Sequence, residues 1–397
     1  MRKFSLILAL FGSSFAVGAV AANSPFDTKS TGVINVAVYG DAPYGTTPTD
    51  TAEQQATPAF IESINADPDV SLVLHVGDIH SGKQFCTQTY DQTIYNLWTA
   101  FQSPLVYTPG DNEWTDCHKT GEGGGAYNPK TGQIDYKVDA AGNLIDYAGG
   151  DPIANLQLVR SIFFSQPGYA LGDRKLVLSQ AQAFDPAHPN DANYVENVMW
   201  EQSKVLFVTL NIPGGSNNDQ DIWYGAPTTS DAQAQEISDR TGADIRWLDA
   251  AFARAAADGV VAVVIETQAD MWDLDGKTAT HLTGYEGIIG EIAAKTTAFG
   301  RPVLLFNGDS HVYRSDNPLV QDAPCVRDPS SGAAAVACPD DDYAQHPYYN
   351  VPNFHRVVVH GSTFPLEWLK LTINPRADAP AGVDAFGPFS WKRMIQQ

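Results

Sequence analysis

Short apolar runs recur along the chain, and turn-forming or polar residues follow them. Most runs are nearly continuous in valine, leucine and isoleucine rather than alternating with polar residues. This pattern is typical of strands that are buried on both faces. The predicted strands are Val33–Tyr39, Leu72–Val76, Leu105–Tyr107, Val205–Leu210, Val260–Ile265, Val303–Phe306 and Arg356–His360.

Candidate helices lie between several of these runs. Residues 239–257 place apolar side chains at helical spacing, and Gly259 follows as a helix C-cap. Residues 51–65, 87–102 and 285–299 are further candidate helices. Alternating strands and helices predict a layered α/β fold. Three irregular segments, 118–150, 211–235 and 315–350, are interpreted as long loop insertions in one domain that spans residues 23–397.

The first 22 residues have the pattern of a secretory signal peptide. Arg2 and Lys3 give a basic start, an apolar run follows, and Ala19-Val20-Ala21 fits a small-residue cleavage site. No later segment is apolar enough to span a bilayer. The sequence therefore predicts a secreted or periplasmic protein with no transmembrane segment in the mature chain.

The chain is strongly acidic, and this limits its partners. Its formal net charge is -22, and removal of residues 1–22 would make it -24. Such a protein does not bind nucleic acid by neutralising phosphates. Its negative field attracts cations instead. The oligomeric state is left open by the sequence.

Four cysteines remain in the predicted mature chain. An even number of cysteines in an exported protein indicates disulfides. The simplest pairing joins Cys86 to Cys117 and Cys325 to Cys338. The first of these bridges would brace the loops that follow two of the predicted strands.

Four Gly-Asp pairs follow predicted strands, at Asp41, Asp78, Asp111 and Asp309. In open α/β sheets, ligands bind at the carboxyl ends of the strands. The fourth pair is followed two residues later by His311. Carboxylates that converge on one edge together with an imidazole indicate a site for a hard metal ion.

Taken in order, these motifs resemble the calcineurin-like metallophosphoesterase family. The family pattern is D-x-H, G-D-x-x-D, G-N-H-D/E, a lone histidine and G-H-x-H. The resemblance covers the whole mature chain, and its clearest matches are His75–Asp78, Pro109–Glu113, Ile245–Leu248 and Gly308–Arg314. It implies a four-layer α/β/β/α sandwich that hydrolyses a small phosphorylated substrate by means of a metal-activated water.

The resemblance also implies a ligand set for one or two divalent metal ions. The first ion would be held by Asp41, Asp78 and His311. The second would share Asp78 as a bridge and add Asp111 and Asp309. Two metals held in this way clamp a phosphate and activate a water molecule.

The chain departs from the family pattern at most of the family's histidines. Pro43, Asn112 and Asp309 stand where the family has histidine, Ser81 replaces an aspartate, and Asp111 replaces an asparagine. Loss of imidazole and gain of carboxylate favour Mg, Mn or Ca over Zn or Fe as the bound metal.

The remaining candidate residues follow from these departures. Asn112 can orient a substrate oxygen, and His80 is a candidate catalytic substitute because Asp78-Ile79-His80 has D-x-H spacing. The fourth block lacks a histidine, so Glu266 and Gln268 are candidates for contact with metal or substrate. Arg314 either contacts a phosphate or pairs with an acid.

Two functions are therefore compatible with the sequence. The first is an exported, metal-dependent phosphoesterase with a carboxylate-rich site. The second is a non-catalytic protein of the same fold that binds a cation or a partner. The geometry of the strand-end carboxylates and His311 is the observation that separates an intact site from a lost one.

Overall fold

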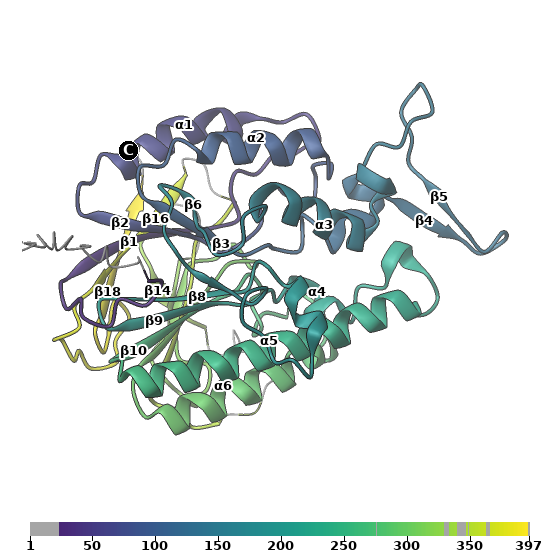
Figure 1. The fold of residues 1–397 in the computed structure, drawn as a ribbon. Coiled ribbons are helices and arrows are strands. Elements are labelled where there is room, and N and C mark those ends of the chain that lie inside the picture. The colour runs from purple at the N-terminus through teal and green to yellow at the C-terminus, as the bar shows by residue number, and fades with distance from the viewer. Residues whose placement is uncertain are drawn as a thin grey trace, which may run out of the picture.

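Two β-sheets lie face to face, and helices cover their outer faces (Figure 1). The computed structural model describes residues 24–274, 276–328, 333–339, 347, 349–362 and 366–395. The predicted signal peptide lies outside the described residues. So does a part of the predicted insertion 315–350.

The first sheet has seven strands. In spatial order they are β17 (Ala385–Phe386), β18 (Phe389–Ile395), β16 (Glu367–Ile373), β1 (Ile34–Tyr39), β2 (Val70–His75), β3 (Pro104–Tyr107) and β6 (Leu171–Gly172). The three central strands β1, β2 and β3 run parallel, so their carboxyl ends lie on the same edge.

The second sheet has nine strands. In spatial order they are β14 (Val336–Ala337), β13 (Val326–Arg327), β12 (Arg314–Asp316), β15 (Phe354–Val358), β11 (Val303–Asn307), β10 (Ala262–Glu266), β9 (Val205–Thr209), β8 (Val198–Gln202) and β7 (Leu178–Ser179). The central strands β15, β11, β10 and β9 are parallel. A separate hairpin, β4 (Gly125–Asn128) and β5 (Gln133–Tyr136), projects away from the two sheets (Figure 1).

Helices flank the sheets on both outer faces. α1 (Ala52–Asn65), α2 (Gln88–Trp98) and α3 (Pro152–Phe163) cover the first sheet, and α5 (Asp231–Asp258) and α6 (Glu286–Phe299) cover the second (Figure 1). The short element α4 (Gly214–Asn218) is a turn with left-handed backbone angles at residues 215–217.

Alternation of side chains along the strands produces three apolar layers. In β1, Val36 and Val38 pack between the two sheets, whereas Ala37 and Tyr39 pack against the helices of the first sheet. Strands of the second sheet divide their side chains in the same way between the central layer and α5 and α6. The predicted four-layer α/β/β/α sandwich is therefore confirmed, and its two-sided burial explains the continuous apolar runs.

The predicted strands and helices are present, with shifts at their ends. The largest shift is in α5, which begins at Asp231 rather than at residue 239. Its first turn is capped by Ser230, whose side chain accepts a hydrogen bond from the backbone N–H of Gln233 at 3.2 Å. The first part of α5 is polar and shows little apolar periodicity. The start of the helix is therefore marked by its N-cap residue and not by the hydrophobic pattern.

Both predicted disulfides are present. Cys86 and Cys117 have Cα atoms 5.7 Å apart, and Cys325 and Cys338 have Cα atoms 5.5 Å apart. The first bridge joins the segment after β2 to the segment after β3. Within the described part of the chain, no helix has the length and apolar character needed to cross a membrane.

A buried carboxyl on α5 makes the stability of the fold depend on pH. Asp244 is buried and accepts a hydrogen bond from Asn197 at 2.7 Å, and burial raises its pKa from 3.8 to about 8. Between these values the folded state binds a proton that the unfolded state lacks. The free energy of unfolding should then fall as the pH rises, by up to about 1.4 kcal/mol per pH unit for this group.

We expect Asp244→Asn to remove this dependence, because the amide does not ionise. Urea unfolding of wild type and variant at pH 5, 6, 7 and 8 should show the variant gaining stability relative to wild type as the pH rises. Other titrating groups cancel in this difference. A stability difference that stays constant between pH 5 and 8 would contradict the assignment.

Candidate metal centre

The loops that follow β1, β2 and β11 meet at one end of the sandwich. Backbone N–H groups of Asp41 and Ala42 donate to the carbonyl oxygens of Gly77 and Asp78, at 2.9 and 3.0 Å, and so join the first two loops. The backbone N–H of Asp309 donates to Asp41 Oδ1 at 2.9 Å and joins the third loop to the first. The site is thus built from both sheets.

Three predicted ligands converge at this junction. One ligand atom each from Asp41, Asp78 and His311 lies within 4.8 Å of the other two. His311 Nε2 is 3.6 Å from Asp41 Oδ1. Both carboxylates are buried, whereas 40% of the His311 side chain is exposed. A cation held by these atoms would therefore face solvent on the histidine side.

The backbone at these residues lies in the left-handed region. The φ angles are 47° at Asp41, 59° at Asp78, 75° at Asp309 and 58° at His311. Non-glycine residues in this region cost of order 1–3 kcal/mol each and cluster at functional sites. Four candidate residues therefore adopt a backbone conformation that costs stability. This indicates that the positions of their side chains are needed for function.

Glycines allow the loops to approach the carboxylates. A Cβ atom at Gly308 would lie 2.3 Å from Asp41 Oδ2, and one at Gly361 would lie 2.1 Å from Asp41 Cβ. A Cβ atom at Gly110 would lie 1.9 Å from Asp78 Oδ1. In two of the Gly-Asp pairs, the glycine therefore leaves room for the aspartate of a neighbouring loop.

Asp78 is held by several donors. Its Oδ2 accepts from the Tyr44 hydroxyl at 2.7 Å and from Asn112 Nδ2 at 3.0 Å, and its Oδ1 accepts from the Asn112 backbone N–H at 3.2 Å. Asn112 Nδ2 also donates to the Tyr44 hydroxyl at 2.9 Å. The Tyr44 hydroxyl lies 3.3 Å from His311 Nε2, so it contacts both ends of the cluster.

Gln268 lies between the two carboxylates predicted for a second metal. Its Oε1 accepts from the backbone N–H of Gly214 at 2.9 Å, which fixes the orientation of the amide. Its Nε2 then donates to Asp78 Oδ2 at 3.3 Å and to Asp111 Oδ1 at 3.2 Å. An amide nitrogen is a donor and not a metal ligand.

The other second-metal residue, Asp309, is also partly engaged. Its Oδ2 accepts from the backbone N–H of Asp270 at 3.0 Å. Neither Asp111 nor Asp309 belongs to a group of three ligand atoms among the residues that the structure describes. The predicted first ligand set thus meets within 4.8 Å. Of the second set, Asp111 Oδ2 and Asp309 Oδ1 both lie beside Gly214, at 2.0 and 3.1 Å from the place that a Cβ atom there would take.

The electrostatics of the cluster favour a cation. Burial raises the pKa of Asp41 to about 7, and it raises the pKa values of Asp78, Asp111 and Asp309 well above their usual range. The carboxylates also raise one another's pKa values by repulsion. Within the described residues, Asp41 Oδ2 is buried and has no hydrogen-bond partner. The donor set therefore fits a hard divalent cation.

No protein-family model and no curated protein matches the chain. Among solved structures, a purple acid phosphatase from yellow lupin (Lupinus luteus) seeds is 14% identical, with a TM-score of 0.37. The match covers 94% of this chain but 53% of the lupin chain, so this chain spans about half of that length. A yeast (Saccharomyces cerevisiae) nitrilase-superfamily protein is 15% identical over 69% of this chain and 75% of its own, with a TM-score of 0.25. Neither likeness carries an argument about activity.

Two predicted site residues, His80 and Glu266, lie outside the group of converging ligand atoms. His80 is buried edge-on against Tyr90, its Nδ1 lies 3.3 Å from the Ser81 carbonyl oxygen, and burial lowers its pKa to about 4. Glu266 ends β10, where burial raises its pKa well above the usual range. Arg314 begins β12 and is half-buried. Among the described residues, no group of ligand atoms includes His80 or Glu266.

The sequence interpretation missed Tyr44. It follows Asp41 by three residues, in the turn Asp41-Ala42-Pro43-Tyr44, and its hydroxyl contacts Asp78, Asn112 and His311. The only signal was an aromatic residue in a polar strand-end turn. That signal is weak because aromatic residues in such turns most often pack on the core.

Proposed function

We propose that the chain is a metal-dependent phosphoester hydrolase with a single cation held by Asp41, Asp78 and His311. The observation that supports it most directly is the convergence of these three ligand atoms within 4.8 Å. They come from strand ends of two sheets, in the order in which the motifs resemble a metallophosphoesterase. The substrate class is a small phosphate ester.

The residues around the ligands support positioning rather than acid catalysis. When bound, a divalent cation would supply a water of lowered pKa and neutralise charge on a phosphate. The half-exposed His311 marks the open side from which a substrate reaches the site. The Asn112 amide is fixed by Tyr44 and Asp78, and it cannot donate a proton as a general acid near neutral pH.

A single cation is supported by Gln268. Its amide nitrogen donates to Asp78 and Asp111 where a second cation would need both carboxylates. These hydrogen bonds partly stabilise the two acids without a metal. Asp111 and Asp309 are then acidic neighbours that strengthen the negative field of the site.

Export to an oxidising compartment is part of the same proposal. The Cys86–Cys117 and Cys325–Cys338 bridges support it, because disulfides persist mainly in secreted and periplasmic proteins. The bridge at Cys117 lies six residues after Asp111 and steadies the loop that carries it. Reduction of the protein should therefore loosen the edge of the site.

The proposal is tested by metal content and turnover. Protein purified without chelator should contain one Mg, Mn, Ca, Zn or Fe per chain by elemental analysis. It should hydrolyse a phosphomonoester or phosphodiester, lose this activity with chelator and regain it when the metal returns. His311→Ala should weaken metal affinity by about 10- to 100-fold or more, the range known for residues that only support a metal ligand.

His188→Ala is the matched control, because His188 is exposed and far along the chain from the ligands. It should leave metal content and turnover unchanged. Equal activity of wild type and His311→Ala would overturn the assignment of the ligand set. Metal binding at this site without turnover on any ester would instead support the non-catalytic alternative, which the Asn112 replacement favours.

A further inference from the structure

A cavity lies at the outer edge of the first sheet, away from the metal centre. It has a volume of about 270 Å³ and lies among α2, the end of α3 and the edge strand β6. β6 pairs with the first two residues of β3, whereas Asp111 follows the other end of that strand. None of the lining residues belongs to the metal centre.

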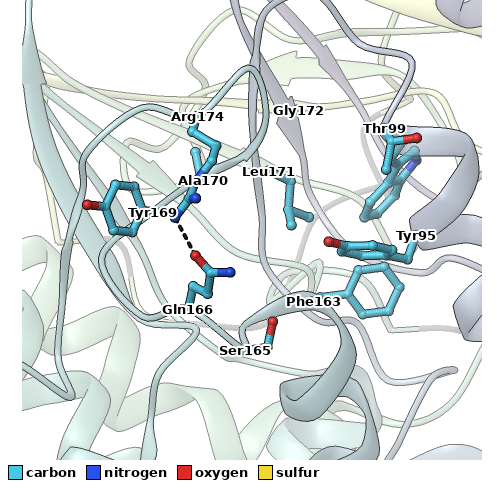
Figure 2. Close-up of a pocket in the computed structure, with 11 residues that line it drawn as sticks. Tyr95, Thr99, Phe163, Ser165, Gln166, Tyr169, Ala170, Leu171, Gly172 and Arg174 are labelled. Atoms are coloured by element: carbon cyan, nitrogen blue, oxygen red, sulfur yellow. Dashed lines mark hydrogen bonds between the residues drawn. The ribbon is translucent and has the colours of Figure 1, made fainter.

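Aromatic side chains form one wall of this cavity. Figure 2 shows Tyr95, Phe163 and Leu171 on one side. Trp98 and Phe163 are nearly buried, and their ring centroids are 5.4 Å apart. The Tyr95 and Phe163 rings meet edge to face with centroids 6.0 Å apart. Tyr95 and Leu171 are half-buried, so these two side chains offer the apolar surface that a ring would contact, and the nearly buried rings support them from behind.

Arg174 provides a positive charge on the opposite wall. Its guanidinium lies 4.2 Å from the centre of the Tyr169 ring and donates one hydrogen bond to Gln166 (Figure 2). Within the described residues it forms no ion pair with a carboxylate. A guanidinium carries five N–H donors, so donors remain for an anion.

No acidic residue lines this cavity, although the chain has 46 aspartates and glutamates. Arg174 is the only charged side chain among the eleven lining residues. A single guanidinium matches the charge and the planar geometry of one carboxylate. The strongly negative chain disfavours a dianion such as phosphate more than it disfavours a monoanion.

We propose that this cavity binds a small carboxylate that carries an aromatic ring. The carboxylate pairs with the Arg174 guanidinium, and the ring packs against Tyr95 and Leu171. The volume lies just below the range of about 300–1,000 Å³ that is usual for sites of drug-sized ligands, so the ligand is a single-ring compound. This site is independent of the proposed hydrolase activity.

Phenylacetate is the probe that tests the proposal. Isothermal titration is performed in the presence of chelator, so that a metal-bound carboxylate does not contribute. Wild type should bind one phenylacetate per chain with a saturable isotherm below about 10 mM. Phenylacetamide, which keeps the ring and lacks the charge, and acetate, which lacks the ring, should each bind at least about tenfold more weakly.

Two variants probe the two walls. Arg174→Gln should weaken phenylacetate binding by about 10- to 100-fold, the effect expected for lost hydrogen bonds to a charged group. Thr99→Trp, at an exposed position on the rim, should fill the cavity and abolish binding. The control Arg376→Gln changes an exposed arginine elsewhere and should bind like wild type. Absence of saturable binding to wild type, or equal affinity in Arg174→Gln, would overturn the proposal.

Discussion

Replacing Asp78 by asparagine is expected to lower metal-dependent turnover by at least about 100-fold. Mutation of a residue that only supports a metal ligand already lowers metal affinity or activity by about 10- to 100-fold. Asp78 supplies a buried ligand atom to the three-residue cluster. The asparagine has the same shape but lacks the negative charge that holds a divalent cation. Turnover on a phosphomonoester and metal affinity by competition with a chromogenic chelator measure the effect.

Thermal unfolding separates a lost metal from a damaged fold. Wild type should be stabilised by the added metal, because a ligand that binds only the folded state stabilises by RT ln(1 + [L]/Kd). Asp78→Asn should show no rise with metal, and its unfolding temperature in chelator measures the cost of setting an NH2 group against the donors that surround Asp78. Tyr44→Phe removes one hydrogen bond to Asp78 and keeps the charge, so its loss of turnover should be nearer tenfold. Turnover of Asp78→Asn within a few-fold of wild type would remove Asp78 from the site.

Gly110→Ala is expected to displace Asp78 and to destabilise the fold. The new Cβ atom would lie 1.9 Å from Asp78 Oδ1 and 2.5 Å from its backbone nitrogen. Gly110 does not have a left-handed φ, so the effect is steric. Overpacking of this kind costs about 1–3 kcal/mol, and a misplacement of about 1 Å at a site costs on the order of 100-fold in rate. Urea unfolding and steady-state kinetics measure the two effects separately.

Gly287→Ala is the control for this substitution. A Cβ atom at Gly287 meets nothing within 4 Å, and the residue is the second of α6. Alanine there should stabilise the protein by roughly 0.5–1 kcal/mol, since glycine is the weaker helix former. If the Gly110→Ala protein has wild-type stability and turnover, the loops around Asp78 can shift to accept the new methyl group, and the steric prediction is wrong.

The strands that carry the site were predictable because burial on both faces leaves a continuous apolar run. β1, β2, β3 and β11 all end within a few residues of the predicted Gly-Asp pairs. The antiparallel strands β16 and β18 were not predicted, because β18 alternates between buried and exposed positions and carries charged residues. β16 pairs with β1, which lies more than 300 residues earlier in the chain, and β18 pairs with β16.

The ligand set was predictable only in part. The strand-end positions of Asp41, Asp78 and His311 predict that these side chains lie at one edge, and their assignment to one cation came from the resemblance to metallophosphoesterases. Gln268 donates a hydrogen bond to Asp111 because the backbone N–H of Gly214, in a loop of the second sheet, holds the Gln268 side-chain amide in that orientation. Sequence spacing carries no information about such an orientation. The aromatic cavity with Arg174 also requires two separate segments, residues 95–99 and 163–174, to meet.

The assembly of the centre from two sheets has a consequence for folding kinetics. The hydrogen bond between Asp309 and Asp41 spans 268 residues, and the contact between His311 and Tyr44 spans 267. We expect contacts of such long range to form late in folding, because the chain between them must first be ordered. A bound cation would then slow unfolding with little effect on the folding rate. Metal supply would set how long the native protein survives proteases, while leaving the time it takes to fold unchanged.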